Sequence, residues 1–81
     1  MKYWVYILKS LNYDKTYIGF TNNLERRLKE HNSGKSIYSN KFMPWKIIYK
    51  EEIIDRTSAR KREKYFKSAA GRKKLKILLK K

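Results

Sequence analysis

The sequence contains no cysteine, only one proline and only seven acidic residues. Without cysteine the chain can form no disulfide bond and no zinc site built on thiolates, which agrees with the reducing cytoplasm where we expect the protein to work. The apolar run at the N-terminus ends at Lys9, which makes it too short for a membrane span, and it lacks a small-residue cleavage site. We therefore interpret this run as the first strand.

The length of 81 residues permits one small domain, which we place over residues 1–81. Hydrophobic residues make up 41% of the chain and aromatic residues 15%, which is enough for a compact core and argues against disorder. The sequence shows no internal repeat and no linker that would divide this domain.

Basic residues dominate the charge, with 22 Lys and Arg against the seven acids and a formal net charge of +15. Such a positive field favours a polyanionic partner, and the abundant one is nucleic acid. An anionic membrane surface is the competing partner, but no helical segment pairs a clean apolar face with a basic one. We therefore expect nucleic acid and no membrane.

Three strands are expected, over residues 3–9, 16–20 and 45–54, because β-branched and aromatic residues are dense there. The first two strands form an antiparallel hairpin, since turn-forming Asn and Asp separate them. The third strand follows Pro44, which makes the residue before it extended.

The first helix is expected between the second and third strands. Asn22 followed by Glu25 resembles a capping box, and Gly34 supplies a left-handed C-cap near the end of the helix. Its periodicity places Leu24 and Leu28 on one side together with His31.

Two further helices are expected after the third strand. Thr57 and Ser58 offer caps for a long helix that reaches about Ala70, and Gly71 then breaks it. A short terminal helix is indicated by the spacing of Leu75, Leu78 and Leu79. The order is thus β-β-α-β-α-α, and the helices must cover the small sheet, which gives an α+β domain.

Arg27 and His31 lie one helical turn apart, so their side chains can converge. The ordinary explanation is that Arg27 points into solvent and that a His31 cation interacts with the helix C-terminus. Taken alone, His31 favours that explanation, whereas Arg27 beside Arg26 suits a contact with phosphate equally well.

Glu63 is the single acid among twelve basic residues in the segment 56–81. Helical spacing places it on the stripe of Phe66, which should face the sheet. A half-buried carboxylate needs a partner, which is either a divalent cation or a basic side chain such as Lys67 or Arg27. Periodicity leaves a metal ligand and an ion pair open.

Tyr6 and Tyr17 suit strands through aromatic propensity alone, and most strand tyrosines belong to the core. Gly19 is more informative, because a glycine inside a strand often marks the close approach of a ligand or of another backbone. Phosphodiester hydrolysis needs a base, a metal on the phosphate oxygens and positive charge for the transition state. A tyrosine beside Mg²⁺ and arginine, with its pKa lowered from about 10, can serve as that base.

Five segments carry a resemblance to a known family: Trp4-Val5-Tyr6, Tyr17-Ile18-Gly19, Leu24 to Gly34, Pro44-Trp45-Lys46 and Ala59 to Glu63. In this order they resemble the GIY-YIG nuclease superfamily, and in particular its small single-domain bacterial branch, which is similar to the N-terminal catalytic domain of the bacterial excision-repair nuclease. The resemblance covers nearly the whole chain, and it is specific because order, spacing and expected elements agree.

The resemblance implies a three-stranded antiparallel sheet flanked by helices, and hydrolysis of a DNA strand at one metal ion. Glu63 would hold Mg²⁺ or Mn²⁺, with water and phosphate oxygens completing the coordination. Gly19 would let the site close over the phosphate.

The same resemblance implies roles for four catalytic side chains. Tyr6 would be the general base on water, and Tyr17 would orient the phosphate or assist the base. Arg27 would stabilise the transition state, and His31 would support the phenol or help with proton transfer. Tyr6 and His31 are thereby assigned to the site rather than to the core and the helix end.

The chain departs from the family pattern in three ways. The first motif lacks the glycine and isoleucine of the family name but keeps its phenol at Tyr6. Larger members place an asparagine near the C-terminal end of the domain, whereas the last asparagine here is Asn40. Many members also set a Lys, His or Tyr before the third strand, where Lys35, Tyr38 and Lys41 are available.

We expect no attached DNA-recognition domain, so specificity should be poor unless a protein partner supplies it. Affinity should then come from phosphate contacts and fall with salt. The basic residues expected to bind the nucleic acid are Arg26, Lys35, Lys41, Arg60 and Arg62.

Two functions follow from these features. The first is a metal-dependent DNA endonuclease of low sequence specificity that acts on double-stranded or branched DNA in repair or processing. The second is a nucleic-acid-binding module that keeps the fold without catalysis. Glu63 favours the first, because binding alone needs no isolated carboxylate in a basic face.

Overall fold

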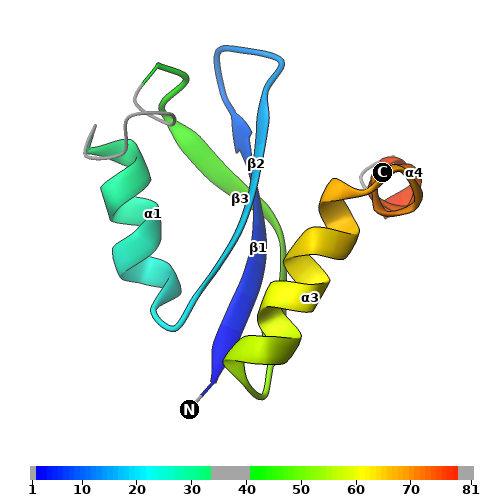
Figure 1. Cartoon of the computed structure of the whole chain (residues 1–81). Helices are drawn as coiled ribbons and strands as arrows, with labels where there is room; N and C mark the ends of the chain where they lie inside the picture. Colours follow the sequence, from blue (N-terminus) through cyan, green and yellow to red (C-terminus); the bar gives the residue numbers. More distant parts are fainter. Residues whose placement is uncertain (1, 34–40, 79–81) are drawn as a thin grey trace.

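The computed structural model describes residues 2–33 and 41–78, which contain three strands and three helices (Figure 1). The elements in chain order are β1 Tyr3–Ser10, β2 Thr16–Thr21, α1 Leu24–Asn32, β3 Trp45–Ile53, α3 Arg56–Lys67 and α4 Ala69–Leu78. The predicted α+β class and the order β-β-α-β-α-α are confirmed. Within the described part, no helix has both the length and the apolar character needed to cross a membrane.

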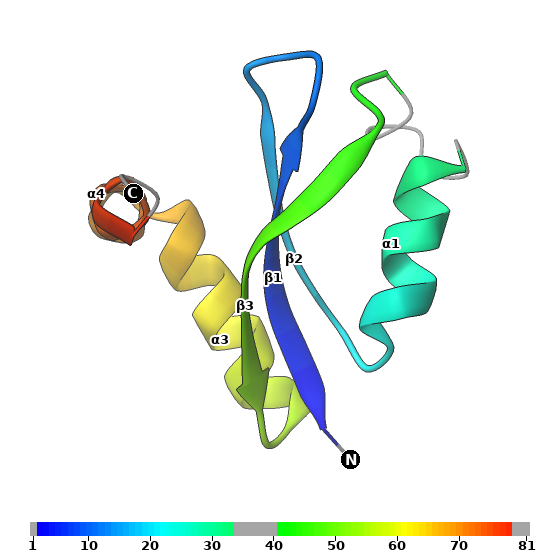
Figure 2. The same cartoon turned by 180° about the vertical axis from the view of Figure 1, so that it is seen from behind.

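The strands form one antiparallel sheet in the order β2-β1-β3, with β1 in the centre. Residues of a strand alternate between two faces, so Tyr6 and Leu8 lie on one face while Val5 and Ile7 lie on the other. The helix α1 covers the first face, and α3 and α4 cover the second, as opposite views show (Figure 1, Figure 2). The predicted sheet flanked by helices is thus confirmed.

The larger apolar core lies between the sheet and the pair α3 and α4. It is built from Val5, Ile7, Ala59, Phe66 and Leu75. Phe66 is completely buried, and burying a side chain of this size contributes about 1.5–3 kcal/mol. This position confirms that the predicted apolar stripe of α3 faces the sheet.

The helices α1 and α3 begin on capping residues other than the predicted ones. Asn23, not Asn22, caps α1, because its side chain accepts a hydrogen bond from the backbone N–H of Arg26 at 3.0 Å. Asp55 caps α3 by accepting from the N–H of Ser58 at 2.7 Å. Both caps bond the amide three residues ahead, as asparagine and aspartate caps usually do.

The predicted helix break at Gly71 is wrong. The break lies at Ser68, which is extended (φ −78°, ψ 167°) and whose hydroxyl accepts a hydrogen bond from the N–H of Gly71 at 3.2 Å. Gly71 itself lies inside α4, where a Cβ would overlap the carbonyl oxygen of Tyr65. Glycine is therefore needed there because α4 approaches the end of α3 closely, a tertiary requirement that local sequence does not reveal.

Candidate active site

Tyr6 lies at the centre of the sheet, on the face that α1 covers, and is paired with Gly19 of the edge strand β2. The Tyr6 residue is only 1% exposed. A Cβ on Gly19 would lie 2.7 Å from the Tyr6 hydroxyl oxygen, which is closer than atoms pack. The close approach predicted at Gly19 is therefore made by the phenol, and closure over a phosphate stays a prediction.

The Tyr6 hydroxyl oxygen lies 3.1 Å from Nε2 of His31, at the end of α1. Tyr6 also forms a hydrogen bond with the guanidinium of Arg27. Arginine can only donate, so the phenol oxygen accepts from Arg27. The phenol donates its own proton to Nε2 of His31 when the imidazole carries its proton on Nδ1, and it accepts from Nε2–H in the other tautomer.

Burial shifts the pKa values of the two hydrogen-bonded groups in opposite directions. It raises the pKa of Tyr6 to about 12, although the Arg27 hydrogen bond acts to lower it. Burial and the nearby Arg27 charge lower the pKa of His31 to about 4. His31 is therefore neutral at pH 7, and its explanation as a cation at the helix terminus is wrong because the side chain is completely buried.

Arg27 contacts both tyrosines and also Glu30 of its own helix. Its Nη1 lies 3.0 Å from Oε1 of Glu30, three residues ahead on the helix. Although burial acts to lower the pKa of Arg27, hydrogen bonds to Glu30, Tyr6 and Tyr17 raise it. The side chain keeps 35% of its surface exposed, so a charged guanidinium is accessible beside the phenols.

Tyr17 completes the cluster from the edge strand β2. Its ring centroid lies 4.6 Å from that of His31 and 6.2 Å from that of Tyr6, against which it stacks. Tyr17 is half-buried, whereas Tyr6 and His31 are buried. The four side chains predicted for catalysis therefore form one cluster, with Arg27 and Tyr17 on its accessible side.

Glu63 approaches this cluster from α3. Its side chain is 19% exposed, and its Oε1 lies 3.5 Å from Nζ of Lys67, so the ion pair with Lys67 that the sequence left open beside a metal ligand is formed. The alternative pair with Arg27 is not formed, since Arg27 pairs with Glu30. The Glu63 charge is nevertheless close enough to Tyr6 to contribute to the raised pKa of the phenol.

The donor set suits a hard divalent ion held by one carboxylate. In residues 2–33 and 41–78, no group of three His, Asp or Glu converges on one point. Magnesium is typically bound through one or two carboxylates, with waters and substrate phosphates as its other ligands. Glu63 fits that pattern, because its partner Lys67 is half exposed and an exposed ion pair contributes little stability.

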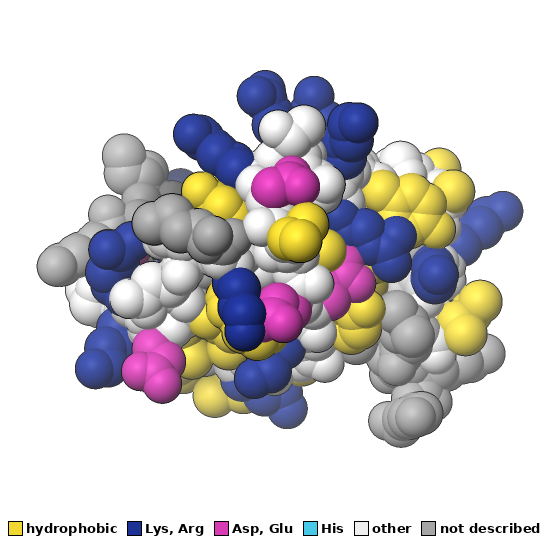
Figure 3. All heavy atoms as spheres, turned by 90° about the horizontal axis from the view of Figure 1, so that it is seen from below, with side chains coloured by type: hydrophobic (Ala, Val, Ile, Leu, Met, Phe, Trp, Pro, Cys, Tyr) yellow, Lys and Arg dark blue, Asp and Glu magenta, His cyan; other side chains and the backbone are white. Residues whose placement is uncertain are grey.

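Three of the residues predicted to bind nucleic acid are exposed on the surface. Arg26, Lys41 and Arg60 are exposed, and Lys35 and Tyr38 lie outside the described residues. Arg62 pairs with Glu51 at 2.6 Å and lies over the ring of Phe66. Lys and Arg side chains are spread around the face drawn in Figure 3, with a few carboxylates between them.

The supporting roles of two further residues are not predicted by the sequence analysis. Glu30 pairs with Arg27, and its i,i+3 spacing was the available signal. Asn32 bonds both backbone groups of Trp45, accepting from its N–H at 2.6 Å and donating to its C=O at 3.1 Å. These two hydrogen bonds fix the end of α1 to the start of β3, and no local pattern predicts them.

Comparison with known proteins shows what the chain as a whole is similar to. The family model of the GIY-YIG catalytic domain matches residues 2–76. A UPF0213 protein of Lactiplantibacillus plantarum is 43% identical over 81 residues, covering 95% of this chain and 78% of that protein. A UPF0213 protein of Clostridium perfringens is 38% identical over 93% of this chain and 81% of its own. The solution NMR structure of the UPF0213 protein BH0048 from Bacillus halodurans superposes with a TM-score of 0.57 at 29% identity, covering 96% of this chain and 83% of that one.

Proposed function

This chain belongs to the GIY-YIG catalytic domain family, and from that membership we propose that it is a metal-dependent DNA endonuclease. Domains of this family are typically nuclease domains. The observation that carries the proposal is the convergence of Tyr6, Arg27 and His31 through hydrogen bonds in a buried polar cluster. A core needs no such cluster, because each buried polar group costs free energy unless it is paired.

We assign binding and charge stabilisation to the accessible side of the cluster. Arg27 presents a guanidinium that can hold two phosphate oxygens and stabilise the charge that develops on them. Tyr17 lies beside it on the edge strand and orients the phosphate. Glu30 holds Arg27 in place before the substrate arrives.

We assign the proton chemistry to the buried side. Tyr6 accepts a proton from the attacking water while its own proton passes to Nε2 of His31, 3.1 Å away. Arg27 supports this transfer, because its hydrogen bond opposes the rise in the Tyr6 pKa that burial causes. His31 must be neutral to accept the proton, and its pKa of about 4 keeps it so at pH 7.

Glu63 is the residue that would hold Mg²⁺ or Mn²⁺, which supplies positive charge to the phosphate oxygens when bound. To do this, Glu63 exchanges its pair with Lys67 for the metal. The carboxylate lies near enough to Tyr6 to act on its charge, so a metal held there serves the same reaction centre.

We further propose that the enzyme acts in the cytoplasm on double-stranded or branched DNA, in repair or processing, with low sequence specificity. Its net charge of +15 supports binding through the DNA backbone, which carries little sequence information. A protein partner would then supply the choice of substrate.

A nucleic-acid-binding module without catalysis is the second candidate. Two observations favour it: the 1% exposure of Tyr6, and its pKa of about 12, which leaves the phenol protonated at neutral pH. The test is incubation of the purified protein with supercoiled, single-stranded and branched DNA, with Mg²⁺, with Mn²⁺ and with chelator. Metal-dependent cutting of any of these substrates supports the endonuclease. Binding without cutting of any of them supports the module.

A further inference from the structure

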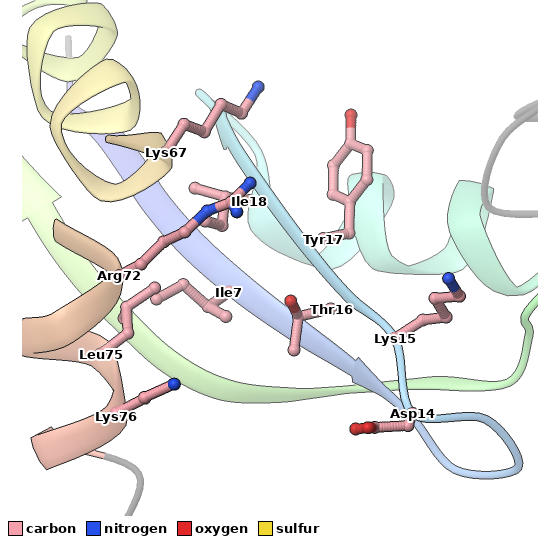
Figure 4. Close-up of a pocket in the computed structure, with 10 residues that line it drawn as sticks. All are labelled: Ile7, Asp14, Lys15, Thr16, Tyr17, Ile18, Lys67, Arg72, Leu75 and Lys76. Atoms are coloured by element: carbon pink, nitrogen blue, oxygen red, sulfur yellow. The ribbon is translucent and has the colours of Figure 1, made fainter. Parts of the chain in front are cut away.

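A groove of about 960 Å³ runs between the edge strand β2 and the helix α4, on the sheet face that α3 and α4 cover (Figure 4). Tyr17 belongs to both, since it lines the groove and contacts the ring of His31. Lys67, at the end of α3, lines the groove and pairs with Glu63. The groove therefore shares Tyr17 with the cluster, and Lys67 connects it to the proposed metal ligand.

The rim of the groove is strongly positive. Lys67, Arg72 and Lys76 extend from the helical side, and Lys15 stands on the strand side (Figure 4). Asp14 is the one acid in the lining, and its carboxylate lies 3.8 Å from Lys9. Four cations against one acid make an anion the complementary occupant.

Two of the three cations on the helical side form no ion pair within the described part of the protein. Among the described residues, no carboxylate forms an ion pair with Arg72 or Lys76, and both side chains are exposed. Figure 4 shows both of them pointing across the groove toward β2. Neighbouring cations without a counter-ion attract a phosphate group.

The floor of the groove is apolar, which excludes a simple phosphate-ion site. Ile7, Ile18 and Leu75 form it beneath the cationic rim. Its size lies near the top of the range of about 300–1,000 Å³ found for small-molecule sites, which is far more than one phosphate fills. A nucleic acid strand offers both required chemistries, because charged phosphates alternate with the apolar faces of sugars and bases.

We propose that this groove binds the stretch of the DNA strand next to the phosphate that is cut. Its phosphates lie on Arg72 and Lys76, and its sugars and bases lie on Ile18 and Leu75. Tyr17 then contacts the strand where it passes from the groove into the catalytic cluster. This inference rests on the proposed function, but it makes a separate statement about binding.

The test is DNA binding measured by fluorescence anisotropy in chelator, where no cutting takes place. The wild type is compared with the double variant Arg72→Gln/Lys76→Gln at several salt concentrations. The control is Lys73→Gln/Lys74→Gln, which removes the same charge from exposed positions of α4 that do not line the groove. A labelled single strand and a blunt duplex are the two probes, because the bound strand can belong to single-stranded or to double-stranded DNA.

We expect the groove variant to lose roughly tenfold or more in affinity at 100 mM salt, and the control to lose much less. For the groove variant, the slope of log affinity against log salt should become shallower by about 1.4 for a single strand or about 1.8 for a duplex, since two phosphate contacts are removed. The probe for which the groove variant loses more affinity than the control variant identifies the source of the strand.

Equal weakening by the groove and control variants would overturn the proposal, because net charge alone would then explain binding. Tighter binding of a poly-glutamate peptide than of either DNA probe would also overturn it. If the wild type cuts DNA and the groove variant binds and cuts as well as the wild type does, the groove proposal fails while the proposed function stands. If the wild type cuts no DNA but the groove variant loses affinity as expected, the proposed function fails while the groove remains a binding site for a DNA strand.

Discussion

The hydroxyl of Tyr6 and Nε2 of His31 lie 3.1 Å apart, although the two residues are 25 positions apart in the chain. This contact joins the central strand to α1 inside a buried region, so it belongs to the fold as well as to the site. Nδ1 of His31 is buried and has no hydrogen-bond partner in the described part of the chain. Such an unpaired group costs about 1–3 kcal/mol, which a function in proton transfer would explain.

His31 should make the stability of the protein depend on pH. Its pKa falls from 6.5 to about 4 on folding, so the unfolded chain binds a proton between these values while the folded protein does not. The contribution of neutral His31 to the folding stability is therefore fully present above about pH 6.5 and is lost as the pH falls toward 4. We expect the free energy of unfolding, measured with urea, to be about 2 kcal/mol lower at pH 5 than at pH 7.

The His31→Gln variant is the control for this prediction, because His31 is the only histidine in the chain. Its unfolding free energy should be nearly equal at pH 5 and pH 7. A wild type and a variant with the same pH dependence would contradict the assignment of the effect to His31.

Two glycine variants separate damage to the site from damage to the fold. Gly19→Ala places a methyl group 2.7 Å from the Tyr6 hydroxyl and should displace it, at a stability cost of about 1–3 kcal/mol. Gly71→Ala presses on the backbone of Tyr65, where α4 meets the end of α3 and not on the Tyr6 hydroxyl, and should also lower stability. The cutting rate per folded molecule should fall only for Gly19→Ala. A similar fall in both variants would argue that the Tyr6 position is not the cause.

Glu63→Gln should abolish metal-dependent cutting while DNA binding in chelator persists. The amide keeps the shape of the side chain but removes the charge that a divalent ion needs. We expect a decrease in cutting of roughly 10²-fold or more, a size typical for the loss of one electrostatic contribution. The matched variant Lys67→Gln, which breaks the same ion pair from the other side, should keep its cutting rate at saturating DNA, since its place on the rim of the groove affects binding only. Equal loss in both variants would point to the pair itself as the requirement.

Arg27→Lys should not restore the function of Arg27, although it keeps the positive charge. The guanidinium contacts Glu30, Tyr6 and Tyr17 together, and one ammonium group cannot reproduce that planar set of donors. We expect cutting to fall by roughly 10²-fold in single-turnover assays, with little change in DNA affinity. Cutting at the wild-type rate would show that Arg27 acts only through its charge.

Much of the fold follows from local sequence patterns. The strands were predicted within one residue of their observed bounds, because alternating aromatic and β-branched residues fall between clear turn residues. The helix ends were less predictable, since Asn22 and Asn23 are chemically equal candidates for one cap. The position of Gly71 inside a helix is not predictable from local sequence, because the need for glycine comes from its contact with Tyr65 on another helix.

The site was predictable in membership but not in its chemistry. The resemblance to a nuclease family predicted which tyrosines, arginine and histidine come together. It did not predict that burial would raise the pKa of Tyr6 or keep His31 neutral, because burial depends on the packing of α1 against the sheet. The predicted lowering of the Tyr6 pKa by Arg27 is present, but burial outweighs it.

The most direct measurement is the rate of supercoiled DNA nicking by the wild type and by Tyr6→Phe, with Mg²⁺ or Mn²⁺ and with chelator. The substitution removes one oxygen atom and keeps the buried ring, so the folded structure should persist, as circular dichroism would check. The account predicts metal-dependent nicking by the wild type and a rate at least roughly 10²-fold lower for Tyr6→Phe, with unchanged DNA binding. Nicking at the wild-type rate by Tyr6→Phe would contradict it.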